Sequence, residues 1–374
     1  MHFLSGQRGS PCMMMTTHTH APADLRTPRV RLWCARTSHP RYIGRWGFRA
    51  RTSGKTTKAV SSSMSSMRTV NIRNNKEHPN SLLLENTLNL EEAFDEGPVM
   101  IFGGPYSNLE ATQAVLNEAK RCRIPPHRII CTGDVVAYCA DPQATVDLVR
   151  HAGIHVVQGN CERSLGMDSE DCGCGFETGS ACSRLSVQWY DYARRSLDEG
   201  ARAWMRELPT CIRFQMGGVV CCAVHATPAS ESEFVFASTP SQVKRRRMAV
   251  LGDARAVACG HSGIPFSQEV QGRLWHNAGV IGMPANDGTP RVWYSIWEAA
   301  EHGLRIRHLP LEYDYTSAAG KMGERGLPDG YREALTSGLW PSLDVLPPLE
   351  KQAAGNRIDQ DALDLTITFP RLGD

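Results

Sequence analysis

The first 70 residues of this 374-residue chain contain almost no acidic side chains and no long apolar run. Asp24 stands alone against 12 Lys and Arg, so residues 1–70 carry a net charge of +11. Without a long apolar run, this segment provides neither a membrane span nor the core of a secretory signal. Its basic, Ser- and Thr-rich composition is typical of a mitochondrial or plastid transit peptide. If it is a leader without a targeting role, or if Met64 or Met67 is the true start, we expect a cytoplasmic protein.

The rest of the chain has no excess of positive charge. The whole sequence carries +2, so residues 71–374 carry about −9 by difference. A mildly acidic body argues against a nucleic-acid-binding surface. Hydrophobic residues make up 41% of the sequence, which is enough for a packed core in one large domain or two small ones.

No secretory signal accompanies the 13 cysteines, so free thiols in a reducing compartment are the default expectation. Cys172, Cys174 and Cys182 lie in a Gly- and acid-rich insert, residues 163–183. Such a cluster could hold zinc or an iron–sulfur centre. The C-x-C spacing is not the usual C-x₂-C, however, and it favours free thiols or a redox disulfide.

Short apolar runs alternate with helical patterns between residues 98 and 157. The pattern predicts strands at 98–102, 128–132 and 154–157, with helices at 109–119 and 142–150. This β-α-β-α-β order indicates parallel strands joined by crossover helices.

Beyond residue 183 the pattern changes. Helices are expected at 184–197, 199–207 and 239–251, and strands at 211–216, 219–224, 255–259, 273–277, 291–297 and 304–309. Only the helix at 239–251 lies between these strands, which indicates a second, mostly antiparallel sheet packed on the first. Residues 71–96 are polar and read as a linker. Residues 316–374, Pro- and Gly-rich with a short helix near 329–336, read as a C-terminal extension.

Four short polar blocks lie where apolar runs end. They are Gly133-Asp134, Gly159-Asn160, Val224-His225-Ala226 and Gly260-His261-Ser262-Gly263. Strands of an α/β sheet deliver their last residues to loops at one edge, where ligands usually bind. One Asp, one Asn and two His form a mixed oxygen and nitrogen donor set that suits Mn²⁺, Fe²⁺ or Zn²⁺. The structural alternative is that these four residues cap loops or form hydrogen bonds in the core.

Taken in order, these blocks resemble the calcineurin-like metallophosphoesterase superfamily, in its small bacterial-type phosphodiesterase branch. The resemblance covers about residues 97–310 and includes the blocks Gly104–Ala111, Gly133–Asp134, Gly159–Glu162, Val224–Ala226, Gly260–Gly263 and Asn277–Gly282. It implies an α/β fold, a four-layer αββα sandwich of two mixed β-sheets, over residues 97–315.

The chain departs from the family pattern at one metal site only. The family holds one metal at the positions that are here Gly104, Tyr106, Asp134 and Gly263, so three of its four ligands are missing. It holds the other metal at the positions that are here Asp134, Asn160, His225 and His261, all of which are present. The resemblance therefore implies a remodelled site for a single metal ion.

Further residues near these blocks are candidates for the chemistry. Tyr106 could donate its hydroxyl to a phosphate oxygen or fill the vacated metal pocket. Cys161 could act as a thiolate ligand or nucleophile, or be a tolerated substitution. Gly103 and Gly104 could bind an anion through their N–H groups, with Asn108 beside them. Pro105 has no N–H, however, so the pattern favours a tight turn, with Ser107 or Asn108 as the helix N-cap.

The resemblance implies a metal-dependent hydrolase, a phosphodiesterase or phosphatase, that acts on a small phosphorylated substrate with one Mn, Fe or Zn ion. The alternative is a catalytically silent protein of the same fold that binds a phosphorylated ligand or a protein partner. The missing ligands favour the alternative, and the intact second set favours the hydrolase.

Overall fold

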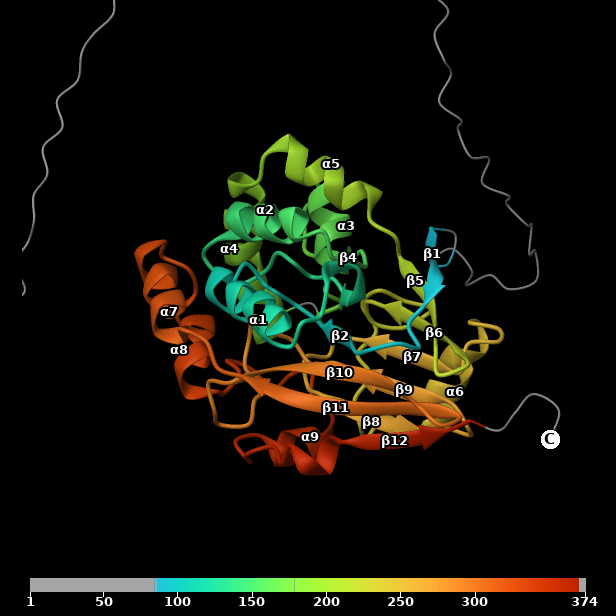
Figure 1. The fold of residues 1–374 in the computed structure, drawn as a ribbon. Coiled ribbons are helices and arrows are strands. Elements are labelled where there is room, and N and C mark those ends of the chain that lie inside the picture. Colours follow the sequence, from blue (N-terminus) through green and yellow to red (C-terminus); the bar gives the residue numbers. More distant parts are fainter. Residues whose placement is uncertain (1–83, 85, 178, 370–374) are drawn as a thin grey trace, which may run out of the picture. The chain divides into compact units, whose positions relative to one another are not determined.

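Two six-stranded mixed sheets pack face to face in the computed structural model of this protein (Figure 1). The structure describes residues 84, 86–177 and 179–369. Residues 1–70, for which a transit peptide is predicted, lie outside this range. Among the described residues, no helix is both long and apolar enough to cross a membrane.

The first sheet has the strand order β12-β11-β10-β2-β3-β4. Its strands are β2 (Val99–Phe102), β3 (Ile129–Cys131), β4 (His155–Val156), β10 (Val292–Ala300), β11 (Gly303–Leu311) and β12 (Leu365–Thr368). Strands β2, β3 and β4 are parallel, as predicted, and helices α1 (Leu109–Arg121) and α2 (Pro142–Ala152) connect them. Strand β10 pairs antiparallel with β2, and β11 and β12 extend the sheet with further antiparallel pairings.

The second sheet has the order β1-β5-β6-β7-β9-β8 and is not mostly antiparallel, so that prediction was wrong. Its strands are β1 (Thr87–Ala93), β5 (Cys211–Met216), β6 (Val219–Val224), β7 (Ala256–Cys259), β8 (Phe266–Glu269) and β9 (Leu274–Asn277). Three of its five pairings are parallel: β1 with β5, β6 with β7 and β7 with β9. The prediction also assigned β10 and β11 to this sheet, whereas β10 pairs with β2 of the first.

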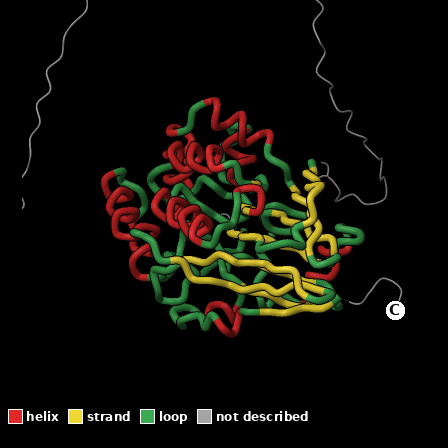
Figure 2. Tube along the Cα trace, viewed as in Figure 1, coloured by secondary structure: helices red, strands yellow, loops and turns green. Residues whose placement is uncertain are grey.

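Alternate side chains of the central strands face opposite sides of the sheet and pack into two different cores. In β2, Met100 and Phe102 face the core beneath the helices, while Val99 and Ile101 face the second sheet. This period of two is expected of a strand that is buried on both faces. A third core cluster lies behind the second sheet and includes Met248 of α6 (Ser241–Ala249). The four-layer αββα arrangement predicted from the sequence is therefore confirmed (Figure 2).

The helices largely follow the predicted pattern. Helices α4 (Ala181–Ser196) and α5 (Glu199–Glu207) begin close to where the periodicity places them. Helix α3 (Asn160–Gly166) was not predicted, and it begins at one of the candidate ligands. The described residues also include the short 3₁₀ helices η2 (Pro126–Arg128) and η3 (Asp361–Leu363).

Both segments predicted as peripheral contribute to the fold. The predicted linker 71–96 contains β1, which pairs with β5 and extends the second sheet. The predicted C-terminal extension contains α7 (Tyr315–Glu324), α8 (Asp329–Ser337) and α9 (Pro348–Ala353), followed by β12. Helix α7 packs on α1 and α8, and β12 pairs with β11. The sandwich therefore extends beyond residues 97–315 at both ends.

Candidate metal centre

Four candidate ligands follow strands from both sheets. Asp134 lies three residues after β3, and Asn160 begins α3 just beyond β4. His225 directly follows β6, and His261 lies two residues after β7. All four side chains are buried. Asp134 adopts a φ of 55°, the left-handed conformation that Asp tolerates better than most residues, at a sharp turn after the strand.

The donor atoms of these residues converge on one point. Nε2 of His225 lies 3.0 Å from Oδ1 of Asn160 and 3.0 Å from Nδ1 of His261. The same Nε2 lies 3.3 Å from Oδ2 of Asp134. Ligand atoms bonded to one ion at about 2.0–2.2 Å are separated by about 2.8–3.6 Å in octahedral or tetrahedral geometry. The observed spacing therefore fits a single transition metal ion.

Hydrogen bonds on the outer side of the site turn lone pairs inward. The carbonyl of Thr132 lies 2.7 Å from Nδ1 of His225 and can only accept, so Nδ1 carries the proton. The amide nitrogen of Asn160 donates to the carbonyl of Cys172 at 2.8 Å, which directs Oδ1 toward His225. Converging lone pairs repel one another unless a cation or a proton lies between them. Hydrogen bonds that hold metal ligands from behind in this way are common.

The charges of the site also suit a cation. Burial disfavours the charged form of Asp134, but His225 and His261 lower the pKa of its carboxyl group below the usual value. Burial opposes protonation of His225, and the Asp134 carboxylate nevertheless raises the pKa of this imidazole. Burial and the neighbouring His225 lower the pKa of His261 to about 3. A carboxylate thus lies beside at least one neutral imidazole, as metal binding requires.

Glu162 supports the site and was not among the predicted site residues. Its buried carboxylate accepts N–H groups of Asp134 at 2.7 Å, Val135 at 2.8 Å and Gly159 at 3.0 Å. Burial, followed by the Asp134 charge, raises the pKa of Glu162 to about 7. The only sequence signal for this role is an acidic residue that closes the Gly159-Asn160-Cys161-Glu162 block.

The alternative of a zinc or iron–sulfur centre on three cysteines is not supported. Cys172 and Cys174 are joined in a disulfide, one of the two outcomes that their spacing favours, and Cys182 lines a pocket beside the metal centre. Sγ of Cys174 lies 3.3 Å from the amide nitrogen of Asn160, so the bridge buttresses a candidate ligand. Within the described residues, the one group of three or more His, Cys, Asp or Glu with metal-like spacing is Asp134, His225 and His261.

Cys161 is poorly suited to act as a nucleophile. Burial, reinforced by the charges of Asp134 and Glu162, raises its pKa well above that of a free thiol. Its backbone N–H donates to Oδ1 of Asp134 at 3.2 Å, and its Sγ lies 3.4 Å from the amide nitrogen of Asn160. The structure therefore gives Cys161 a positioning role.

The two glycines of the predicted anion site before α1 have no free N–H groups. The N–H of Gly103 donates to Gly279 O at 3.1 Å, and the N–H of Gly104 donates to Gly133 O at 3.0 Å. The side-chain oxygen Oδ1 of Asn108 accepts the N–H of Ala111, so Asn108 caps the helix. These groups are used within the fold, so the tight-turn interpretation is the better one.

Aromatic rings lie next to Gly104 and Gly263. A Cβ atom on Gly104 would lie 2.5 Å from Cζ of Tyr106, so the tyrosine ring fills the space of a side chain at 104. A Cβ atom on Gly263, whose φ is +72°, would lie 3.3 Å from Cζ2 of Trp340. Aromatic rings therefore lie against both glycines, which stand at two of the positions where the resemblance implies missing ligands.

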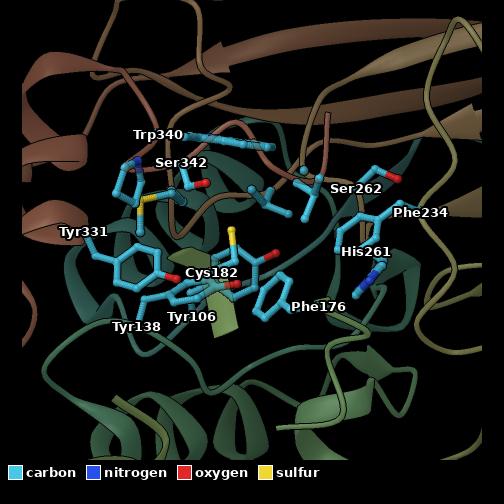
Figure 3. Close-up of a pocket in the computed structure, with 15 residues that line it drawn as sticks. Tyr106, Tyr138, Phe176, Cys182, Phe234, His261, Ser262, Tyr331, Trp340 and Ser342 are labelled. Atoms are coloured by element: carbon cyan, nitrogen blue, oxygen red, sulfur yellow. The ribbon is translucent and has the colours of Figure 1, made fainter. Parts of the chain in front are cut away.

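Beside the metal centre lies a cavity of about 70 Å³ that we call the aromatic pocket (Figure 3). Its aromatic lining consists of Tyr106, Tyr138, Phe176, Phe234, Tyr331 and Trp340. His261 also lines it, so the candidate ligand forms part of its wall. No Asp, Glu, Lys or Arg among the described residues lines this pocket.

Known proteins share this fold and sequence pattern. The family model of the calcineurin-like phosphoesterase superfamily domain matches residues 104–299. An uncharacterized protein of Methanocaldococcus jannaschii is 28% identical over 258 residues, which cover 64% of this chain and 98% of that protein.

Two solved structures have a similar fold, and each aligns with 65% of this chain and 99% of its own. A hypothetical protein from Pyrococcus horikoshii OT3 has a TM-score of 0.55 at 14% identity. A metallophosphoesterase from Sphaerobacter thermophilus has a TM-score of 0.50 at 23% identity. Because the family model spans over half of the sequence, the chain belongs to the calcineurin-like phosphoesterase superfamily.

Proposed function

We propose that this protein hydrolyses a phosphoester with a single divalent transition metal ion, Mn, Fe or Zn, held by four side chains. The observation that carries the proposal is the convergence of donor atoms from Asp134, Asn160, His225 and His261. When bound, such an ion polarises a phosphoryl oxygen and lowers the pKa of a water molecule. The substrate is a small phosphorylated molecule, either a monoester or a diester.

The surrounding residues hold this donor set in place. The Thr132 carbonyl fixes the tautomer of His225, and the Glu162 carboxylate ties the Asp134 turn to the start of α3. Preorganised ligands spare the reaction the cost of arranging them. Since these partners are buried, they also keep water away from the inner side of the site.

Other side chains can offset the charge that a second metal would otherwise neutralise. Burial, followed by the Asp134 charge, raises the pKa of Tyr106 well above 10, so its hydroxyl keeps its proton and can donate to a phosphoryl oxygen. Arg163 lies one helical turn from Asn160 on α3 and forms an ion pair with Glu231. A phosphate that displaces Glu231 could pair with this guanidinium.

The test is His261→Ala, with His151→Ala as a matched control on the exposed face of α2. We expect one metal ion per chain in the wild type and in the control, together with hydrolysis of a generic aryl phosphodiester. In His261→Ala we expect metal content and turnover to fall together, turnover by at least about a hundredfold. Turnover that persists in this variant would rule out the proposed mechanism.

The rings over Gly104 and Gly263 favour a second candidate function, a binding protein without activity. Such a protein would bind the metal ion and a phosphorylated ligand through the same residues. It would show stoichiometric metal, lost in His261→Ala, but no turnover of monoesters or diesters.

A further inference from the structure

The aromatic pocket and the metal centre are adjacent because they share one residue, His261. His261 contributes Nδ1 to the donor set and also lines the pocket, and the ring of Phe234 packs against it with centroids 4.4 Å apart. A ligand whose phosphoryl group lies at the metal centre would therefore direct its remaining part into this pocket.

The lining of the pocket selects a flat, uncharged group. In Figure 3, Trp340 lies on one side of the pocket, and Tyr106, Tyr138 and Phe176 lie on the opposite side. Rings on opposite walls can contact both faces of a planar ligand. Stacking of this kind tolerates different aromatic ligands because each of them has a π face.

The rings are fixed before any ligand binds. Trp340 donates its indole N–H to the carbonyl of Pro284 at 2.7 Å and its backbone N–H to Oδ1 of Asn286 at 2.8 Å. Tyr138 packs against Tyr106 with centroids 4.8 Å apart and against Tyr331 at 4.5 Å. Fixed rings lower the entropic cost of binding a rigid ligand.

The two glycines make these rings possible. A side chain at 104 would collide with the ring of Tyr106, and one at 263 would press on Trp340. The same positions are those at which the family pattern carries metal ligands. Two positions that leave room for the rings of the aromatic pocket are thus also positions where the resemblance implies missing ligands.

We propose that the aromatic pocket binds an aromatic ring in the alcohol part of the phosphoester, either a simple aryl group or the base of a nucleoside. This inference rests on the proposed function and names the substrate class of the same site. Hydrolysis adds water across the P–O ester bond, so the aromatic alcohol leaves with one proton from that water.

Calorimetry with phosphonates tests the pocket separately from turnover, because phosphonates cannot be hydrolysed at the P–C bond by this chemistry. The full-length, Mn²⁺-loaded protein is titrated with phenylphosphonate, methylphosphonate and an adenine-bearing acyclic nucleoside phosphonate. We expect phenylphosphonate to bind about tenfold more tightly than methylphosphonate. A greater preference for the adenine compound would identify the base of a nucleoside as the ring, whereas an equal or smaller one would identify a simple aryl group.

Trp340→Leu keeps an apolar side chain but removes the flat face, and we expect it to abolish most of the tenfold preference without loss of metal. Tyr331→Leu provides a second variant if Trp340→Leu does not fold, with the same expected loss. Trp204→Leu, on the half-buried face of α5, is the matched control and should keep the preference.

Equal binding of phenyl- and methylphosphonate by the wild type would overturn the inference. An unchanged preference in a folded Trp340→Leu protein, or in Tyr331→Leu if Trp340→Leu does not fold, would also overturn it. Preference without any ester hydrolysis would support the pocket and contradict only the proposed function. Ester hydrolysis without a preference for phenylphosphonate would support the proposed function and contradict only the role of the aromatic pocket.

Discussion

Glu162 is a buried carboxylate whose oxygens accept backbone N–H groups of Asp134, Val135 and Gly159. It binds no metal in the proposed site, yet it fixes the two turns that present Asp134 and Asn160. Groups that hold metal ligands through hydrogen bonds tune metal affinity by orienting those ligands. At the residue scale, the site therefore depends on five acidic and polar side chains rather than four.

Replacing this carboxylate tests that role. In Glu162→Gln an amide NH₂ group faces backbone donors, so we expect the protein to lose about 1–3 kcal/mol of stability. We also expect metal affinity to fall about 10–100-fold because the turns are less well fixed. Denaturant unfolding and metal titration measure the two effects, with the exposed Glu333→Gln on α8 as control. Unchanged metal affinity in a folded Glu162→Gln protein would contradict the positioning role.

At the scale of elements, a buried chain of side chains joins the two sheets. The hydroxyl of Ser267 on β8 lies 2.9 Å from Nδ1 of His276 on β9 and 2.9 Å from Nε2 of His308 on β11. Nε2 of His276 lies 2.9 Å from the hydroxyl of Ser295 on β10. Burial lowers the pKa of His276 well below its usual value and that of His308 to about 3.

These lowered pKa values predict how stability depends on pH. Below about pH 6.5 the unfolded chain takes up protons on both imidazoles that the folded chain does not. The free energy of unfolding should therefore fall as the pH falls from about 6.5 toward 3, by about 1.4 kcal/mol per pH unit for each imidazole. His308→Gln keeps a hydrogen-bonding side chain without titration, and its slope should be smaller by that amount. Denaturant unfolding at several pH values gives both slopes, and equal slopes would refute the assignment to His308.

Most elements could be predicted from the sequence because their periodicity is local. Helices α1 and α2 and strands β2 and β3 all carry clear apolar patterns. Strand β8, with the sequence Phe-Ser-Gln-Glu, carries none, and α3 is short and follows a Gly-Asn turn. The pairing of β10 with β2 joins residues nearly 200 positions apart, and no local pattern encodes such a contact.

The candidate site was predictable to a similar extent. Each of its polar blocks ends an apolar run, so the sequence indicated where the ligands lie. It did not indicate the hydrogen bonds that occupy Gly103 and Gly104, or the ring of Tyr106 over Gly104, because these depend on the exact path of the backbone.

At the scale of the whole molecule, the metal centre draws on both sheets and the aromatic pocket on the C-terminal segment. Asp134 and Asn160 follow strands of the first sheet, and His225 and His261 follow strands of the second. Trp340 comes from the segment that the sequence suggested to be a peripheral extension. Its indole is placed by contact with Pro284, 56 positions earlier, so its role could not be predicted from local composition.

The most direct test of the central claim is anomalous diffraction from crystals of the Mn²⁺- or Zn²⁺-loaded protein. We predict a single anomalous peak per chain, bonded to Asp134, Asn160, His225 and His261 at about 2.0–2.2 Å. We predict no second peak beside Tyr106, because its ring occupies that space. A second metal ion next to Tyr106, or no peak at the four ligands, would contradict the single-metal account.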